Sequence, residues 1–268
     1  MNVIRIWVLA LLSMIFLSAC EAKKTQDDVQ KDESKASAAA EILPYLKIQE
    51  QPAKIALPFC ESKECLDLHI QTIQTADPWL NTWIERQQAM VVQDQIGLKQ
   101  AMHLQQAVDA YIRASDIAQE SEGADAFRLD MYTRIPTQRN QYVLLQIGLN
   151  SQQKGIEISE RNYFYVADRK ASKAVALLDI IEPSQQVTMD KIVQQAYQKW
   201  LLEQELQVQA KAPKKLYWGQ ADWFFDQEGV GLHYRSDEIV KDSRQLDVYL
   251  TKQQTQQVLK LTVYEHMF

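Results

Sequence analysis

Hydrophobic and polar positions alternate in several stretches of the chain. Leu66, Leu68 and Ile70 are separated by polar residues, which is the period-two pattern of a strand with one buried face. Three later stretches rich in β-forming residues predict consecutive antiparallel strands. These stretches are 127–131, 142–149 and 156–166. The first half of the chain therefore contains most of an antiparallel sheet.

Two other stretches repeat apolar residues every three or four positions, as amphipathic helices do. The first begins at Asp77-Pro78, a favourable N-cap and first-turn pair, and continues to Ile112. Gly97 interrupts it, so one long helix or two shorter helices are expected. The second helix is predicted over 189–201, with Thr188 as its N-cap.

The C-terminal part predicts a second group of strands. Two aromatic and apolar stretches, 222–225 and 230–234, flank a turn in which Gly229 can adopt a positive φ and close a hairpin. Another strand is predicted over 246–250, and a short amphipathic helix follows it. Because strands and helices come in separate runs, the sequence predicts an α+β fold, with antiparallel sheet packed against two or three helices.

The N-terminus carries a short apolar run. Arg5 precedes residues 6–16, which are fewer than the roughly 20 residues that span a bilayer. The run ends in Leu17-Ser18-Ala19-Cys20, which resembles the lipobox of bacterial lipoproteins. The resemblance implies a signal peptide, residues 1–19, and a lipidated Cys20 that anchors the protein to a membrane. The alternative is an ordinary secretory signal followed by a chance cysteine.

The segment after the lipobox indicates where the folded body begins. Residue 21 is Glu; Asp at this place favours inner-membrane retention in Gram-negative lipoproteins, so we expect the outer membrane, facing the periplasm. Residues 20–43 contain the lipidated cysteine and a tether that cannot bury enough apolar surface to fold. The folded body spans 44–268, either as one domain or as the subdomains 44–170 and 171–268.

The remaining two cysteines, Cys60 and Cys65, are close in sequence. In an exported protein such a pair is most simply a local disulfide that closes a small loop. Zinc is the alternative, with His69 nearby, but a four-residue gap and one histidine make a weak zinc pattern. We therefore expect a disulfide, no metal and no cofactor.

Composition excludes several functional classes. The chain has 268 residues and a formal net charge of -6, which provides no basic surface for nucleic acid. It contains seven glycines, fewer than the usual share of about 7%, which argues against a glycine-rich phosphate loop. The four histidines are isolated in sequence and form no known catalytic motif.

An acidic cluster around the C-terminal hairpin is the one place from which catalytic carboxylates could be drawn. The cluster consists of Asp222, Asp226, Glu228, Asp237 and Glu238. Turn and edge residues are usually acidic for solvation, so we assign no catalytic residue and expect that the protein is not an enzyme.

Aromatic residues in the same region are the better candidates for binding. They are Trp218, Trp223, Phe225 and Tyr234. Alternation places Trp223 and Phe225 on one face of their strand and Phe224 on the other, so one set could form a platform for sugars or a protein partner. The alternative is that the whole set packs in the core.

The hairpin also carries a family resemblance. The run 223–240, followed by 246–250, resembles the C-terminal domain of the RsiV family of envelope proteins, in which an aromatic strand, a D-x-x-G turn and an apolar strand ending in Tyr occur in this order. The upstream order also agrees, over roughly 55–260. In contrast, residues 150–155 replace a loop that is usually glycine-rich in the family, so no contacts of that loop are transferred.

The resemblance implies a non-catalytic binding module at the cell wall, because the family includes a lysozyme-sensing anti-sigma factor and a module of a peptidoglycan deacetylase. The first hypothesis is thus a lipid-anchored protein that binds peptidoglycan or a basic, lysozyme-like protein, to which an acidic surface is suited. The second is a structural or envelope-assembly lipoprotein that acts in a protein complex through the helix from Pro78 to about Gln119.

Overall fold

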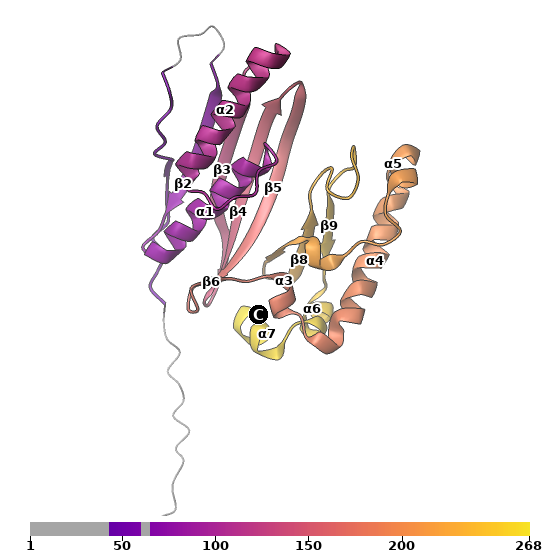
Figure 1. Cartoon of the computed structure of the whole chain (residues 1–268). Coiled ribbons are helices and arrows are strands. Elements are labelled where there is room, and N and C mark those ends of the chain that lie inside the picture. Colours follow the sequence, from indigo (N-terminus) through magenta and orange to yellow (C-terminus); the bar gives the residue numbers. More distant parts are fainter. Residues whose placement is uncertain (1–42, 60–64) are drawn as a thin grey trace, which may run out of the picture. The chain divides into compact units, whose positions relative to one another are not determined.

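A six-stranded sheet forms the N-terminal half of the folded body (Figure 1). The computed structural model describes residues 43–59 and 65–268. The strands follow one another across the sheet in chain order, and each neighbouring pair is antiparallel except β2 and β3. They are β1 (Gln49–Pro52), β2 (Asp67–Gln74), β3 (Arg128–Arg139), β4 (Tyr142–Gln153), β5 (Ile156–Asp168) and β6 (Lys173–Ala174).

The parallel pair of β2 and β3 requires a crossover, and two helices provide it. Helix α1 spans Pro78–Asp94 and α2 spans Leu104–Glu122. As predicted, Asp77 caps α1: its carboxylate accepts a hydrogen bond from the amide of Leu80 at 3.1 Å. Gly97 lies between the helices with a φ of 68°, a left-handed angle that glycine adopts easily and that a helix does not contain. The two helices are therefore separate, as one of the two alternatives predicted.

A three-stranded antiparallel sheet and several helices form the C-terminal half. The predicted hairpin and third strand are present. The strands are β7 (Asp222–Phe225), β8 (Val230–Tyr234) and β9 (Leu246–Tyr249). The helices are α3 (Leu177–Ile180), α4 (Gln186–Leu202), α5 (Leu206–Lys211), α6 (Lys252–Val258) and α7 (Leu261–Met267). The α+β class expected from the sequence is therefore confirmed, although one strand pair is parallel.

One predicted helix start is wrong. Helix α4 begins at Gln186, directly after a single 3₁₀ turn, Pro183–Gln185, and not after Thr188. The hydroxyl of Thr188 instead donates to Oε1 of Gln185 at 2.9 Å. Proline fixes the φ angle that a first helical turn needs, so the chain enters the helix three residues earlier than the Thr188 cap implied.

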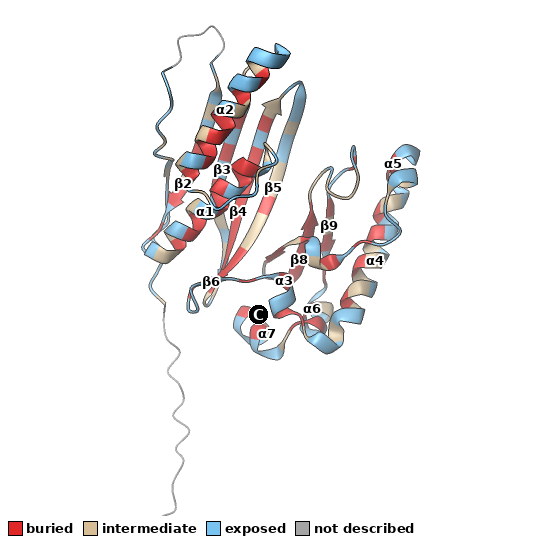
Figure 2. Cartoon of the chain, in the orientation of Figure 1, coloured by how far each residue is buried: buried red, intermediate tan, exposed pale blue. Residues whose placement is uncertain are grey.

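Strand β4 belongs to two hydrophobic cores, and Figure 2 shows it buried along most of its length. Val143, Leu145 and Ile147 pack with α1 and α2 on one face. On the other face, Tyr142 and Leu144 pack with α4 and the small sheet. Two-sided burial explains why this stretch is apolar at nearly every position rather than at every second one.

The segment 150–155, where the RsiV family is usually glycine-rich, is the end of β4 and a tight turn. Lys154 and Gly155 form the turn, with φ angles of 47° and 75°. Both angles lie in the left-handed region that two-residue hairpin turns require. No loop projects from the sheet here.

Candidate functional site

The four aromatic candidates lie in the core of the small sheet. Trp218 and Trp223 are each 4% exposed, and Phe225 and Tyr234 are fully buried. Trp223 donates its indole N–H to the carbonyl of Val175 at 2.9 Å. The core-packing alternative therefore describes this set, which we call the hairpin aromatics, and none of them offers a platform on the surface of this structure.

Phe224, on the opposite face of β7, is also buried. Its ring centroid lies 5.1 Å from that of Phe164 in β5 and 5.2 Å from that of Tyr249 in β9. The alternation that separates Phe224 from Trp223 and Phe225 is thus as predicted. Both faces of the strand are covered because the large sheet packs on the second face.

The predicted lipidation and disulfide sites fall partly outside the described residues. The signal peptide, Cys20, the tether up to residue 42 and Cys60 all lie outside them. The lipid anchor and the disulfide of Cys60 with Cys65 consequently remain predictions. Within 43–59 and 65–268, no three His, Cys, Asp or Glu side chains are grouped to hold a metal ion, and no helix is long and apolar enough to cross a bilayer.

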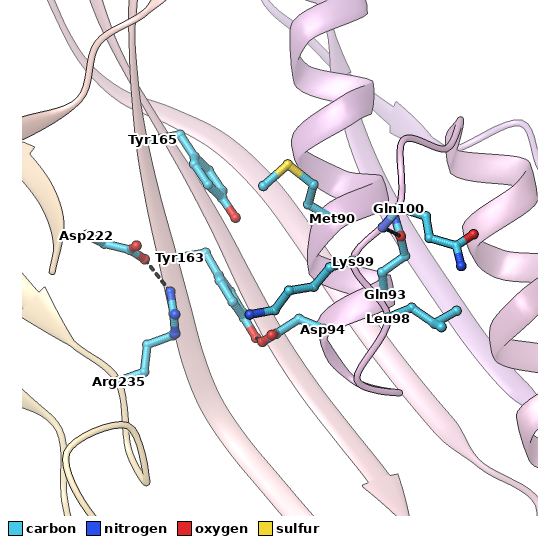
Figure 3. Close-up of a pocket in the computed structure, with 10 residues that line it drawn as sticks. All are labelled: Met90, Gln93, Asp94, Leu98, Lys99, Gln100, Tyr163, Tyr165, Asp222 and Arg235. Carbon is cyan, nitrogen blue, oxygen red and sulfur yellow. Dashed lines mark hydrogen bonds and ion pairs between the residues drawn. The ribbon is translucent and has the colours of Figure 1, made fainter. Parts of the chain in front are cut away.

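A cavity of about 430 Å³ opens where α1, the edge of β5 and the small sheet approach one another (Figure 3). Its lining comes from four separate parts of the sequence. The helix side consists of Met90, Gln93, Asp94, Leu98, Lys99 and Gln100. The strand side consists of Tyr163, Tyr165, Asp222 and Arg235. We call this cavity the pocket.

Asp222 and Arg235 form the wall of the pocket on the small-sheet side. Oδ2 of Asp222 accepts hydrogen bonds from the guanidinium of Arg235 at 2.7 Å and from the amide of Phe164 at 3.1 Å. The amide of Phe164 is available because β6 pairs with β5 only at Ala167 and Asp168, which leaves the rest of this edge without a neighbouring strand. Asp222 therefore joins the small sheet to an open strand edge.

Burial raises the pKa of the Asp222 carboxyl, and Arg235 and the amide of Phe164 oppose the rise. The same guanidinium also binds Oε1 of Glu238 at 3.0 Å. Arg235 thus serves two carboxylates. Its guanidinium is therefore engaged within the protein.

Tyr163 lies at the base of the pocket, and its hydroxyl joins the sheet to helix α1. The hydroxyl donates to Oδ2 of Asp94 at 2.7 Å and accepts from Nε2 of Gln95 at 2.9 Å. Arg235 stacks on the ring, 4.6 Å from its centroid. Burial, followed by the nearby Asp94 charge, raises the pKa of Tyr163 above its ordinary value. Tyr163 therefore remains a neutral hydrogen-bond donor.

Tyr165 shares this face of β5 with Tyr163, and together we call them the pocket tyrosines. Figure 3 shows its hydroxyl pointing into the pocket. In the described part of the chain this hydroxyl has no hydrogen-bond partner. Burial raises the pKa of Tyr165 well above its ordinary value, so it too is neutral, and its hydroxyl can both donate and accept a hydrogen bond.

Gln93 organises the loop that forms the helix side of the pocket. It is buried, and its Oε1 accepts from the amide of Gln100 at 2.9 Å. Its Nε2 donates to the carbonyl of Ala89 one turn earlier. The loop is thereby tied to α1, and it presents Lys99, which forms no ion pair with any described residue.

Comparisons with known proteins identify the fold. No protein-family model matches the chain, and no curated protein matches it. A crystal structure of a DUF3298 family protein from Pseudomonas aeruginosa PAO1 superimposes with a TM-score of 0.60 at 18% identity, covering 82% of this chain and 97% of that one. The fold is that of a DUF3298 protein.

A second DUF3298 protein, from Bacteroides fragilis, agrees with this result. It superimposes with a TM-score of 0.55 at 12% identity, over 83% of this chain and 97% of that one. At these identities the likeness establishes the DUF3298 fold and nothing more. The pocket must accordingly be interpreted from the residues of this chain.

Some residues of the pocket were among those predicted from the sequence, although the pocket itself was not. Asp222 and Glu238 belonged to the predicted acidic cluster, and the structure brings both to Arg235. Asp226 is elsewhere, where its carboxylate accepts from the amides of Glu228 and Gly229 in the hairpin turn. The pocket tyrosines, Lys99 and Arg235 were missed as site residues. The spacing of two tyrosines on one phase of a strand was the available signal.

The pocket is suited to binding a small polar ligand. It combines a hydroxyl with no partner, a partly buried carboxyl with one unused oxygen, a lysine with no ion pair to a described residue, and apolar surface from Met90 and Leu98. Pockets of a few hundred Å³ with a few convergent polar groups are the usual form of a ligand site.

Proposed function

We propose that the protein is a non-catalytic binding protein of the bacterial cell envelope, anchored through a lipid on Cys20. The lipobox-like sequence supports the anchor and the envelope location, and the fold shared with proteins of two bacteria supports a bacterial protein. The pocket carries the proposal for binding, because it is a formed cavity with unused polar groups.

The engagement of the pocket's charged groups favours binding over catalysis. Acid–base chemistry needs a titratable group that exchanges a proton with the substrate. Asp222 is held by Arg235 and the amide of Phe164, and Asp94 is held by Tyr163. His233 lies opposite Asp222 in the small sheet. It is buried, and its Nδ1 lies 2.6 Å from Oδ1 of Asp247. These groups are therefore used to shape the pocket.

The ligand we propose is a component of the cell wall, either peptidoglycan or a basic protein of the lysozyme type. The resemblance to the RsiV family supports both. The formal charge of -6 favours a basic protein through long-range attraction. Location on the periplasmic side of the outer membrane would give the protein access to either one.

Sedimentation and capture assays test the binding. The full chain, purified from the envelope in detergent, should sediment with purified peptidoglycan sacculi or be retained on immobilised lysozyme. If neither occurs, the binding function is wrong. The sacculi should release no soluble fragments during the incubation, and their release would show that the protein is an enzyme.

Labelling tests the anchor separately. Radioactive palmitate should label the wild-type protein and not the Cys20→Ser variant. The same variant should leave the membrane fraction. A Cys20→Ser protein that remains labelled, or that stays in the outer membrane, would contradict anchoring through this residue.

A second candidate, an envelope-assembly lipoprotein, is favoured by one observation. Leu202 and Leu206, where α4 is followed by α5, are 79% and 81% exposed. The tryptophans of α1 do not provide such a surface, since Trp83 is buried and Trp79 stacks on it with 6.1 Å between ring centroids. Cross-linking in cells would recover a specific partner from the wild type and lose it in Leu206→Asp, whereas recovery of an isolated species excludes this role.

A further inference from the structure

Three polar groups of the pocket have no complete set of partners within the protein. The hydroxyl of Tyr165 has none among the described residues. Asp222 makes its hydrogen bonds through Oδ2, which leaves Oδ1 unused. Lys99 has no ion-pair partner in the described part of the chain. Tyr165 and Asp222 are partly buried, and such groups gain most from a ligand that completes their bonds, whereas Lys99 is exposed and contributes its charge.

These groups come from two sides of the pocket, with Asp222 on the small sheet, Tyr165 on β5 and Lys99 in the loop after α1 (Figure 3). On the small-sheet side, Arg235 pairs with Asp222, which lines the cavity, and also with Glu238, which lies outside its lining, and Oδ1 of Asp222 is left unused. On the helix side, Lys99 is the cation. Asp94 is also on that side; its Oδ2 accepts from Tyr163 and its Oδ1 has no hydrogen-bond partner among the described residues, so the helix side carries one charge of each sign.

Two apolar side chains, Met90 and Leu98, also line the pocket. Met90 is half exposed and Leu98 is partly exposed, and both border the cavity. Tyr163 offers no open aromatic face, because it is 2% exposed and carries Arg235 on its ring. A ring that stacks flat on an aromatic surface, as a sugar does, finds no such surface on this residue. Met90 and Leu98 offer apolar surface to a short aliphatic group.

We propose that the pocket binds a small zwitterion of the amino-acid or short-peptide class, with its ammonium group at Asp222 and Tyr165 and its carboxylate at Lys99. This inference rests on the proposed binding function and specifies the ligand of the same pocket. The short chain of the ligand lies against Met90 and Leu98.

Calorimetric titration of the full chain with dialanine, in its L,L and D,D forms, tests the proposal. We expect one form to bind with a Kd of about 1 mM or tighter, as is usual for so small a ligand. N-acetyl-dialanine lacks the ammonium group and dialanine amide lacks the carboxylate. Each should bind at least about tenfold more weakly, because each loses a charge-assisted bond.

Three variants test the assignment of each group. Asp222→Asn should weaken dialanine binding by about tenfold or more, Tyr165→Phe by about threefold to tenfold, and Lys99→Gln by about twofold to fivefold. Tyr249→Phe and Lys191→Gln alter an exposed tyrosine and an exposed lysine elsewhere and should have no effect. Asp222 also supports the fold, so the other two variants decide the outcome if Asp222→Asn fails to fold.

Several results would overturn the proposal. They are equal binding of dialanine and N-acetyl-dialanine, binding of N-acetylglucosamine with no binding of dialanine, wild-type affinity in both Tyr165→Phe and Lys99→Gln, and no binding of any probe. Sedimentation with sacculi and capture on lysozyme then separate the two levels. If the wild type still binds either one, the envelope function stands and only the ligand class of the pocket is wrong.

Discussion

The hairpin aromatics and the pocket tyrosines are both sets of aromatic side chains, but they differ in where their polar atoms bond. In the first set, Trp223 and Tyr234 donate to the backbone carbonyls of Val175 and Tyr217, inside the fold. In the second set, Tyr163 bonds to side chains of α1 and Tyr165 points into a cavity. The part of the sequence richest in aromatic residues therefore lies in the core, whereas the pocket lies beside the edge of β5 that has no neighbouring strand.

The largest expected effect tests the structural role of the hairpin aromatics. Trp223→Ala removes a buried ring and its hydrogen bond to Val175, so it should lower the free energy of unfolding by about 3–5 kcal/mol. Urea denaturation followed by circular dichroism measures this change. A loss below about 1 kcal/mol would show that Trp223 is not packed as described, and the contrast with the pocket tyrosines would fail.

A pair of glycine variants compares a buried ring with an accessible one. A Cβ at Gly231 would collide with the ring of Phe224, and a Cβ at Gly148 would collide with the ring of Tyr132. Phe224 is enclosed by Phe164 and Tyr249, while Tyr132 is 40% exposed and can swing aside. Gly231→Ala should therefore cost about 3 kcal/mol and Gly148→Ala about 1 kcal/mol.

Thermal unfolding of the two glycine variants provides the comparison. Gly148→Ala combined with Tyr132→Ala should lose the clash and recover most of the stability of the Tyr132→Ala protein. Equal destabilisation by the two single variants would mean that exposure of the neighbouring ring does not set the cost.

Tyr163→Phe should have an intermediate effect, because Tyr163 is buried like the hairpin aromatics but bonds to side chains near solvent. The variant loses the bonds to Asp94 and Gln95. Asp94 is exposed and can be hydrated instead, so we expect a loss of about 1–2 kcal/mol in urea denaturation. Tyr249→Phe, an exposed hydroxyl, should lose nothing measurable. If Tyr163→Phe lost no more stability than Tyr249→Phe, the hydrogen bonds of Tyr163 would not join β5 to α1 as described.

High pH separates the pocket tyrosines from exposed ones. The pKa of Tyr165 is raised by burial, while in the unfolded chain it is about 10. Its contribution to stability is thus complete below pH 10 and is lost as the pH rises from there towards the folded-state pKa. Wild type should lose about 1 kcal/mol more than Tyr165→Phe between pH 9 and pH 11. If the stability of wild type and of Tyr165→Phe fell in parallel over this pH range, Tyr165 would ionise as readily in the folded state as in the unfolded chain.

Much of the fold could be predicted because local patterns specify it. The alternation around Ile70, the cap at Asp77, the break at Gly97 and the C-terminal hairpin all describe real elements. The parallel pairing of β2 and β3 could not be predicted, since it depends on where a crossover returns the chain. Thr188 was misread because a cap-like residue lay just inside a helix that Pro183 had already started.

The pocket could not be predicted for a different physical reason. Its residues come from positions 90–100, 163–165, 222 and 235. No local sequence motif marks any of these positions as part of a site. What makes Arg235 important is the pair of carboxylates that folding brings to it, one of which follows it by only three residues. The sequence alone showed only that Arg235 follows a predicted strand and is surrounded by acidic residues.

The smallest expected effect on stability is the sharpest test of the comparison. Tyr165→Phe removes a hydroxyl that has no partner in the described part of the chain, so the free energy of unfolding at pH 7 should change by less than about 0.5 kcal/mol. Ordinary burial of a tyrosine hydroxyl with a partner, as in Tyr234, should instead cost about 1 kcal/mol on change to Phe. Urea denaturation of the two variants, side by side, measures the difference. If Tyr165→Phe is as destabilising as Tyr234→Phe, its hydroxyl contributes to the fold, and the distinction between core aromatics and pocket tyrosines does not hold. If only Tyr165→Phe leaves stability unchanged, its hydroxyl is free to bind a ligand.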